Sequence, residues 1–213
     1  LDDWRRENVD KCMKMLYDSS QVVKPWVRFG MGSFGIWTTQ KKAAQAYGLT
    51  LPSGITGLDD YDVQACNPIE WVKNGYVDYI NPQLYWATTS SGQDYDVLCE
   101  WWAKDVCQHF SDLLPDGKKV HFFSSQAAYR AVDGGFSEGV AEIQKQITAN
   151  RKNLSSGSTG SVFYNTTSYR QMSTDLAESH FIYKALPPAM DWKVTDDLDA
   201  PTQLTVSGKQ ITW

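Results

Sequence analysis

The sequence predicts an α/β fold with a parallel sheet, and two observations support this. Four extended, apolar segments alternate with helical segments along the chain, and strands in such an alternation are joined by right-handed crossovers and lie parallel. The 213 residues, 42% hydrophobic and 13% aromatic, are also enough for one domain with a substantial core. Four strands are too few to close a barrel, which takes about eight, so the sheet is either open or part of a larger barrel.

The individual elements follow from local sequence. Trp4, Val9 and Met13 recur at helical spacing, and Asp3 is placed to cap this first helix over residues 4–19. Residues 26–37 are extended and apolar, and residues 38–62 are expected to form a loop with a short helix. The other helices are expected at residues 68–74, 95–110, 137–154 and 174–186, and the other strands at residues 77–85, 120–125 and 161–165.

The strand at residues 77–85 has the most informative ending, INPQLYW. Side chains alternate along a strand, so Gln83 and Tyr85 share one face and Trp86 lies on the other. Parallel α/β folds meet their ligands at the carboxyl ends of strands. Amide and aromatic groups suit sugar hydroxyls and sugar faces, so this strand end is a candidate saccharide site, with an aromatic cap over the core as the alternative.

Charge and hydropathy exclude several classes of partner. The net charge of -5, with no basic cluster, argues against nucleic acid or an anionic membrane surface. No apolar run approaches the roughly 20 residues needed to span a bilayer, and no signal peptide is visible.

The four cysteines do not have the spacing of a metal site. Cys12, Cys66, Cys99 and Cys107 lack CxxC or Cys/His patterns, and only three histidines are present. Cys99 and Cys107 fall on one predicted helix about 12 Å apart along its axis, beyond the reach of a disulfide. We therefore expect buried thiols, no metal site and no cofactor.

A glycine-rich motif, GMGSFG at residues 30–35, fits GxGxxG after a strand. A dinucleotide site also needs the third glycine to open a helix and an acid at the end of a second strand. Here Gly35 runs into IWTTQ, and Asp59 and Asp60 lie in a Gly/Pro loop, which disfavours that interpretation. A serine hydrolase elbow around Ser33 is disfavoured because Met31 occupies the first glycine position.

Five segments, in order, resemble the second half of the bacterial glycosyl hydrolase-like family ten: DWRRENV (3–9), KPWVRFGMGSFGIW (24–37), WVKNGYVDYINPQLYW (71–86), YDVLCEWWA (95–103) and ALPPAMDW (185–192). The resemblance implies the C-terminal half of a TIM (β/α)8 barrel, with four βα units over residues 1–192. It also implies a glycan or oligosaccharide substrate, including peptidoglycan strands, and a periplasmic, cell-surface or secreted location.

Glycoside hydrolysis needs two carboxyl groups flanking the scissile bond. The four predicted strands end instead in Trp37, Trp86, Ser125 and Asn165. Asp78 lies near the start of its strand, at the face of a barrel that serves stability. Glutamates on predicted helices are expected to be solvated: Glu7, Glu100 and Glu142. The identity of the catalytic residues therefore stays unknown from this sequence.

The last residues are predicted to form a separate segment. Residues 193–200 read as a polar linker, and residues 200–213 alternate as a hairpin that turns at Gly208. This hairpin resembles the opening strands of a fibronectin type III domain. Residues 193–213 thus form a linker and a partial fibronectin type III-like β segment.

Two functions are compatible with these features. In the first, the chain is part of a glycoside hydrolase and supplies saccharide-binding surface, while the catalytic carboxylates lie upstream. In the second, it is a non-catalytic carbohydrate-binding or assembly module. The residues expected to contact the saccharide are Trp37, Gln83, Tyr85, Trp86, Tyr129 and Asn165. The unpaired edges of a half-barrel, at residues 26–32 and 161–165, also predict a possible homodimer.

Overall fold

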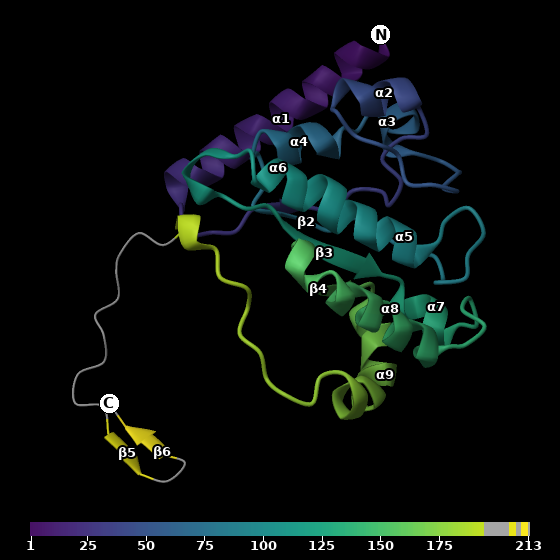
Figure 1. The fold of residues 1–213 in the computed structure, drawn as a ribbon, viewed down its shortest axis with the longest axis vertical. Coiled ribbons are helices and arrows are strands. Elements are labelled where there is room, and N and C mark those ends of the chain that lie inside the picture. Colours follow the sequence, from purple (N-terminus) through teal and green to yellow (C-terminus); the bar gives the residue numbers. More distant parts are fainter. Residues whose placement is uncertain (194–204, 208–209, 213) are drawn as a thin grey trace.

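A four-stranded parallel sheet forms the centre of the molecule, as shown by a computed structural model that describes residues 1–193, 205–207 and 210–212. Its strands follow chain order: β1 (Gly30–Met31), β2 (Tyr79–Ile80), β3 (His121–Gln126) and β4 (Ser158–Phe163). Each strand lies parallel to the next, and helices alternate with the strands along the chain (Figure 1). The predicted α/β fold is confirmed, and it is consistent with part of a TIM barrel.

The sheet pairs over shorter stretches than the sequence predicts. Only two residues each of β1 and β2 pair in the ladder. Single bridges from Phe34 to Gln83 and from Gln83 to Ser125 continue the same strand order toward the carboxyl ends of the strands. β4 begins three residues before the predicted start at residue 161. The register shifts between Phe122 and Phe123, and the hydroxyl of Thr159 donates to the Phe122 carbonyl at 2.9 Å. This side-chain bond holds the start of β4 against β3.

Helices pack side by side along the chain. Those that cover the sheet include α1 (Asp2–Val23), α4 (Pro68–Lys73), α5 (Tyr95–Glu100), α8 (Val140–Lys152) and α9 (Thr166–Ser179). α5 continues through the π-helical segment η1 (Trp101–Gln108) into α6 (His109–Ser111). α1 contacts α4, α4 contacts η1, α5 contacts α8, and α8 contacts α9 (Figure 1). Short helices α2 (Lys41–Ala46), α3 (Asp60–Val63) and α7 (Ala128–Val132) lie in the connections.

The core is rich in large aromatic side chains whose polar atoms are satisfied. Trp71, Trp102, Ile80 and Phe122 are completely buried, and full burial of such a side chain contributes about 1.5–3 kcal/mol. The Trp71 indole N–H donates to the Asp10 carboxylate at 2.7 Å. The indole N–H of Trp102, within η1, donates to the carbonyl of Gly35 at 2.8 Å, which ties the helical layer to the end of the β1 segment.

The expected cap at Asp3 is wrong, because α1 already begins at Asp2 and Leu1 precedes it. Asp3 instead accepts from Arg6 at 2.6 Å. The Arg6 guanidinium is buried, lies 3.9 Å from the centre of the Tyr61 ring and donates to the Tyr61 carbonyl. Asp3 thus orients a buried arginine that joins α1 to α3.

The last large helix also differs from its prediction at residues 174–186. α9 begins at Thr166, because the Asn165 side chain accepts from the backbone N–H of Ser168 at 3.0 Å and caps it. It ends at Ser179, and the residues that follow carry exposed apolar side chains, Ile182, Tyr183 and Leu186.

All four cysteines are free thiols. Cys99 and Cys107 are buried as expected, and burial raises their pKa values. Cys12 is exposed on α1 and corrects the expectation of buried thiols, while Cys66 is half-buried. Within the described residues no group of three or more His, Cys, Asp or Glu side chains is arranged to hold a metal ion.

At the C-terminus, β5 (Thr205–Ser207) pairs antiparallel with β6 (Gln210–Thr212). The predicted turn at Gly208 and most of the predicted linker fall outside the described residues. The fibronectin type III-like assignment and the domain boundary after residue 192 stay predictions. No helix in the described part of the chain has the length and apolar character needed to cross a bilayer.

Candidate functional site

Three tyrosines gather at the carboxyl ends of β2, β3 and β4. Tyr85 follows the β2 segment, Tyr129 lies at the start of α7 just after β3, and Tyr164 follows β4. The ring centres of Tyr85 and Tyr129 are 6.2 Å apart, those of Tyr85 and Tyr164 6.1 Å, and those of Tyr129 and Tyr164 6.2 Å. We call these three residues the tyrosine cluster.

The structure thus brings together two residues predicted from the sequence, Tyr85 and Tyr129, and adds Tyr164, which was missed. Tyr164 is 56% exposed, whereas the other two are half-buried. The signal for Tyr164 was its place near the end of the strand predicted at residues 161–165, much as Tyr85 ends the strand predicted at residues 77–85. Burial raises the pKa of the Tyr85 hydroxyl above its ordinary value, so this hydroxyl stays protonated at neutral pH and can donate a hydrogen bond.

Trp86 packs beside the cluster on the other face of the β2 segment. Its ring meets the ring of Phe34 edge to face, with centres 5.6 Å apart. A β-carbon at Gly35 would lie 2.7 Å from the Trp86 ring and 2.3 Å from the Gln83 carbonyl, so this close approach requires glycine. Trp86 is half-buried, and part of its surface is available to a ligand.

Gln83 lies between Phe34 and Ser125 in the bridges that prolong the sheet, and it is half-buried. Its expected place on the same face as Tyr85 agrees with the burial pattern, because Pro82 and Leu84 are buried between half-buried neighbours.

Trp37 does not lie on a ligand-accessible surface, which corrects the expectation for this residue. Its side chain is 1% exposed, its indole N–H donates to Asn67 at 3.1 Å, and it stacks against Trp101. A sugar ring cannot reach a side chain so enclosed.

Asn165 has a structural task beside the tyrosine cluster. Its side-chain oxygen accepts from the Ser168 backbone as the N-cap of α9, which commits that oxygen to the helix. A contribution of Asn165 to ligand binding stays a prediction, and it would have to come from the amide nitrogen.

Two carboxyl groups accept hydrogen bonds from backbone N–H groups near the strand ends. Asp60, at the start of α3, accepts from the Phe34 N–H at 2.8 Å, and Glu142, on α8, accepts from the Thr88 N–H at 2.7 Å. Asp60 is 0% and Glu142 2% exposed, so the expectation that Glu142 is solvated is wrong. Burial raises the pKa of Asp60 to about 7. Both groups are buried and bonded to backbone N–H groups, so neither is placed to attack a saccharide.

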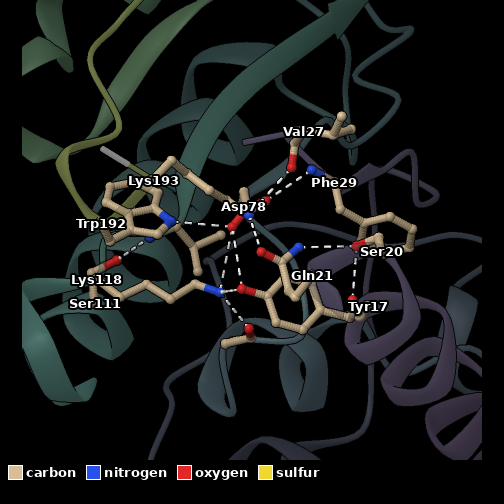
Figure 2. Close-up of polar contacts among 12 residues, drawn as sticks. Tyr17, Ser20, Gln21, Val27, Phe29, Asp78, Ser111, Lys118, Trp192 and Lys193 are labelled. Atoms are coloured by element: carbon tan, nitrogen blue, oxygen red, sulfur yellow. Dashed lines mark hydrogen bonds and ion pairs between the residues drawn. The ribbon is translucent and has the colours of Figure 1, made fainter. Parts of the chain in front are cut away.

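Asp78 occupies the opposite, amino end of the sheet, immediately before β2, where it is the centre of a buried polar network (Figure 2). Its oxygens lie 2.8 Å from Lys193 and 3.5 Å from Lys118. The Phe29 backbone N–H and the Trp192 indole N–H donate to the same carboxylate at 2.8 and 3.1 Å.

The partners of Asp78 determine its charge. Burial alone would raise the pKa of this carboxyl, but the bonds from Lys193, Phe29 and Trp192 and the charge of Lys118 outweigh burial and hold the pKa below its ordinary value. Burial lowers the pKa of Lys118 to about 8, so both groups are ionised at pH 7. A carboxylate fixed by two lysines, at this end of the sheet, serves stability.

Comparisons with known proteins point to one family. A family model described as Glycosyl hydrolase-like 10 matches residues 1–127 of this chain. The protein named Glycosyl hydrolase YngK, from Bacillus subtilis (strain 168), is 32% identical over 155 residues, which cover 71% of this chain and 28% of that protein. Glycosyl hydrolase DigH, from Escherichia coli (strain K12), is 32% identical over 149 residues, covering 70% and 32%. The match thus spans about a third of the length of these relatives.

Proposed function

Because this chain belongs to the glycosyl hydrolase-like 10 family, we propose that it is part of a glycoside hydrolase-like protein and supplies saccharide-binding surface at the carboxyl ends of β2, β3 and β4. The observation that carries the proposal is the tyrosine cluster, because one tyrosine comes from each of three successive strand ends. Aromatic faces stack on the apolar faces of sugar rings, and phenol hydroxyls bond sugar hydroxyls.

We place the catalytic carboxyl pair in sequence upstream of this chain. The strand-end carboxylates Asp60 and Glu142 are buried and bonded to backbone, and Asp78 lies at the other end of the sheet. The relatives are about three times as long as the region that matches, which leaves room for further βα units. Adding four units would give the eight strands of a closed barrel.

The finer assignments rest on the family. We infer a bacterial cell-envelope glycan, such as peptidoglycan strands with β-1,4-type linkages, as the substrate. A periplasmic, cell-surface or secreted location follows from that substrate.

A second candidate is a non-catalytic carbohydrate-binding or assembly module. The burial of Asp60 and Glu142 favours it for this polypeptide taken alone. In that case the two edge strands, β1 and β4, would be covered by a second copy of the chain. Light scattering coupled to size exclusion across a dilution series tests this: a monomer at every concentration contradicts the homodimer.

Saccharide binding is tested at the most exposed member of the cluster. Tyr164→Ala should weaken binding of solubilised peptidoglycan strands about threefold to tenfold, the range expected for one aromatic contact, and leave the melting temperature nearly unchanged because Tyr164 is 56% exposed. Tyr183→Ala is the matched control, since Tyr183 is 87% exposed and lies outside the cluster. Equal affinity of the two variants would contradict the site.

Catalysis is tested by incubating the chain with the same strands and separating the products by chromatography. We expect no release above background, because general acid catalysis contributes roughly 10² to 10⁴-fold and no suitably placed acid is exposed among the described strand-end residues. Hydrolysis above background by the chain alone would overturn the upstream placement of the carboxyl pair.

A further inference from the structure

The inward face of α8 carries a polar stripe: Glu142, Gln146 and Asn150. The three residues follow one another at intervals of four, so they lie on one side of the helix, and all three are buried. Asn150 donates to the Gly160 carbonyl and the Ser161 hydroxyl in the middle of β4. The other two reach the carboxyl end of β2.

Glu142 uses both carboxylate oxygens on Thr88. One oxygen accepts the Thr88 backbone N–H at 2.7 Å and the other the Thr88 hydroxyl at 3.2 Å. Hydrogen bonds to an ionised acceptor are stronger than neutral ones, and two of them fix the orientation of Thr88 as well as its position.

Gln146 joins this contact to the neighbouring strand. Its side-chain nitrogen donates to the Trp86 carbonyl at 3.1 Å and to Glu142 at 3.0 Å. Its oxygen accepts from Gln126, at the end of β3, at 3.4 Å. The Trp86 carbonyl, which in a longer strand would pair with a neighbouring strand, is thus bonded by the Gln146 side chain of a helix.

A third helix side chain completes the arrangement. Arg130, on α7, donates to the Tyr85 carbonyl at 2.6 Å. The carbonyls of Tyr85 and Trp86 and the N–H of Thr88 are therefore all held by side chains from α7 and α8. These backbone groups belong to Tyr85 and Trp86, the two aromatic residues of the candidate site on this segment, and to Thr88, two residues further along the chain.

Burying the Glu142 carboxylate costs desolvation free energy, which suggests that its hydrogen bonds to Thr88 have a specific role. None of the ion pairs among the described residues includes Glu142, so its direct partners are hydrogen-bond donors, and a buried carboxylate is expensive to desolvate. An apolar residue would pack at this position without that cost, but it would leave the Thr88 N–H unbonded.

From these contacts we propose that Glu142 and Gln146 are positioning residues of the candidate site. They fix the backbone from Trp86 to Thr88, and through it the direction in which the Tyr85 and Trp86 side chains leave the strand. The inference rests on the proposed function for its biological meaning, whereas the coupling of Glu142 to the conformation of Trp86 can be measured without a ligand.

The experiment compares Glu142→Ala with two matched variants of the full chain. Glu142→Gln keeps the shape and one acceptor oxygen for the Thr88 N–H. Asn150→Ala removes an equally buried member of the same stripe that bonds β4 instead. Both alanine variants should lose stability, so the melting temperature does not distinguish a positioning role from a structural one.

The deciding readout is the resonance of Trp86. The chain has nine tryptophans, so bulk fluorescence is uninformative, and we use ¹⁹F NMR of protein labelled with 5-fluorotryptophan, with Trp86 assigned by its loss in Trp86→Phe. Glu142→Ala should shift or broaden this resonance, Glu142→Gln should restore it, and Asn150→Ala should leave it in place. An unchanged Trp86 signal in Glu142→Ala, or an equal change in Asn150→Ala, overturns the proposal.

Glycan affinity is measured on the same variants with solubilised peptidoglycan strands. Glu142→Ala should bind about tenfold more weakly, as expected for the loss of a hydrogen bond to a charged group, and Glu142→Gln should stay within about threefold of the parent on the same scale. If the parent protein does not bind the strands, the proposed function fails while the NMR comparison still decides the positioning role. Should Glu142→Ala not fold, Gln146→Ala, which removes the bond to the Trp86 carbonyl, takes its place: an unmoved Trp86 resonance there overturns the proposal.

Discussion

Two buried aspartates, at opposite ends of the sheet, have opposite surroundings. At the amino end, Asp78 lies beside Lys118 and Lys193. It also accepts hydrogen bonds from the Tyr17 hydroxyl, the Phe29 N–H and the Trp192 indole, and its pKa is held below the ordinary value. At the carboxyl end of the β1 segment, Asp60 accepts one backbone N–H, and burial raises its pKa to about 7. No ion pair to Asp60 is found in the described part of the chain.

The difference shows that the paired charges around Asp78 lie at the end of the sheet opposite to the proposed saccharide surface. The amino end concentrates charge in a fully paired network that joins α1, β2 and the residues after α9 (Figure 2). At the carboxyl end, aromatic and amide side chains are half-buried, and the carboxyl groups of Asp60 and Glu142 are buried and bonded to backbone N–H groups. The Arg130 guanidinium at this end is bonded to the Tyr85 carbonyl, and we propose that tyrosine, tryptophan and glutamine side chains contact a ligand here.

The largest effect is expected at the amino end. Asp78→Asn should destabilise the protein by about 3–5 kcal/mol, because it leaves Lys118 and Lys193 buried without a counter-charge. Urea unfolding measures this, and glycan affinity should be unchanged under conditions where the variant is folded. A loss below about 1 kcal/mol, the value of a surface ion pair, would contradict the role of Asp78.

The pH dependence of stability separates the two aspartates. Folded Asp60, with a pKa of about 7, keeps a proton that the unfolded chain releases near pH 4. Stability should therefore fall as the pH rises from 4 to 7, by up to about 4 kcal/mol. Asp78, with its lowered pKa, acts oppositely: its contribution is present above about pH 4 and is lost as the pH falls through the folded pKa.

The control for this comparison is Asp60→Asn, which keeps an acceptor for Phe34 but cannot titrate. Urea unfolding of both proteins at several pH values gives the difference between their free energies of unfolding. The contribution of Asp10, whose pKa is also raised, is the same in both proteins and cancels in this difference. A difference that does not change between pH 4 and 7 would show that Asp60 is ionised throughout.

A smaller effect is expected at Trp86, where stability and binding overlap. Its half-buried ring packs on Phe34 and over Gly35, so Trp86→Ala should cost about 2 kcal/mol, less than a fully buried tryptophan, and should weaken glycan binding as well. Trp26→Ala serves as control, since Trp26 is exposed. Stability loss with unaltered affinity would assign Trp86 to the core alone.

The smallest effect should come from Asn165. Asn165→Ala removes the cap of α9 and should cost about 1 kcal/mol, whereas Asn165→Asp should retain most of it. Chemical unfolding gives both values. Weaker glycan binding by Asn165→Asp, with the cap intact, would show that the amide nitrogen contacts the saccharide.

Local periodicity explains which parts of the site could be predicted. Alternation along a strand placed Gln83 and Tyr85 on one face, since that pattern depends only on neighbouring residues. The same reasoning failed for Trp37, whose burial comes from Asn67 and Trp101, both far along the chain. No pattern around Trp37 itself distinguishes a strand-end ligand contact from a core side chain.

Helix patterns failed in a related way at α8. Polar residues at intervals of four, as at Glu142, Gln146 and Asn150, are typical of a solvated helix face. Here that face is turned inward, because the backbone at the end of β2 and the middle of β4 needs donors and acceptors. The prediction also missed the start of α9, which it put at residue 174, although Asn165 precedes a helix-compatible run and asparagine is a preferred N-cap.

The position of Lys193 has a mechanical consequence. Its ammonium group bonds Asp78, Gln21 and the Val27 carbonyl at the amino end of the sheet. A pulling force applied to the chain beyond this residue would load the Asp78 network and α1 first. The tyrosine cluster, at the other end of the strands, would be insulated from that load, so a tether attached after Lys193 would leave the strand-end surface undistorted.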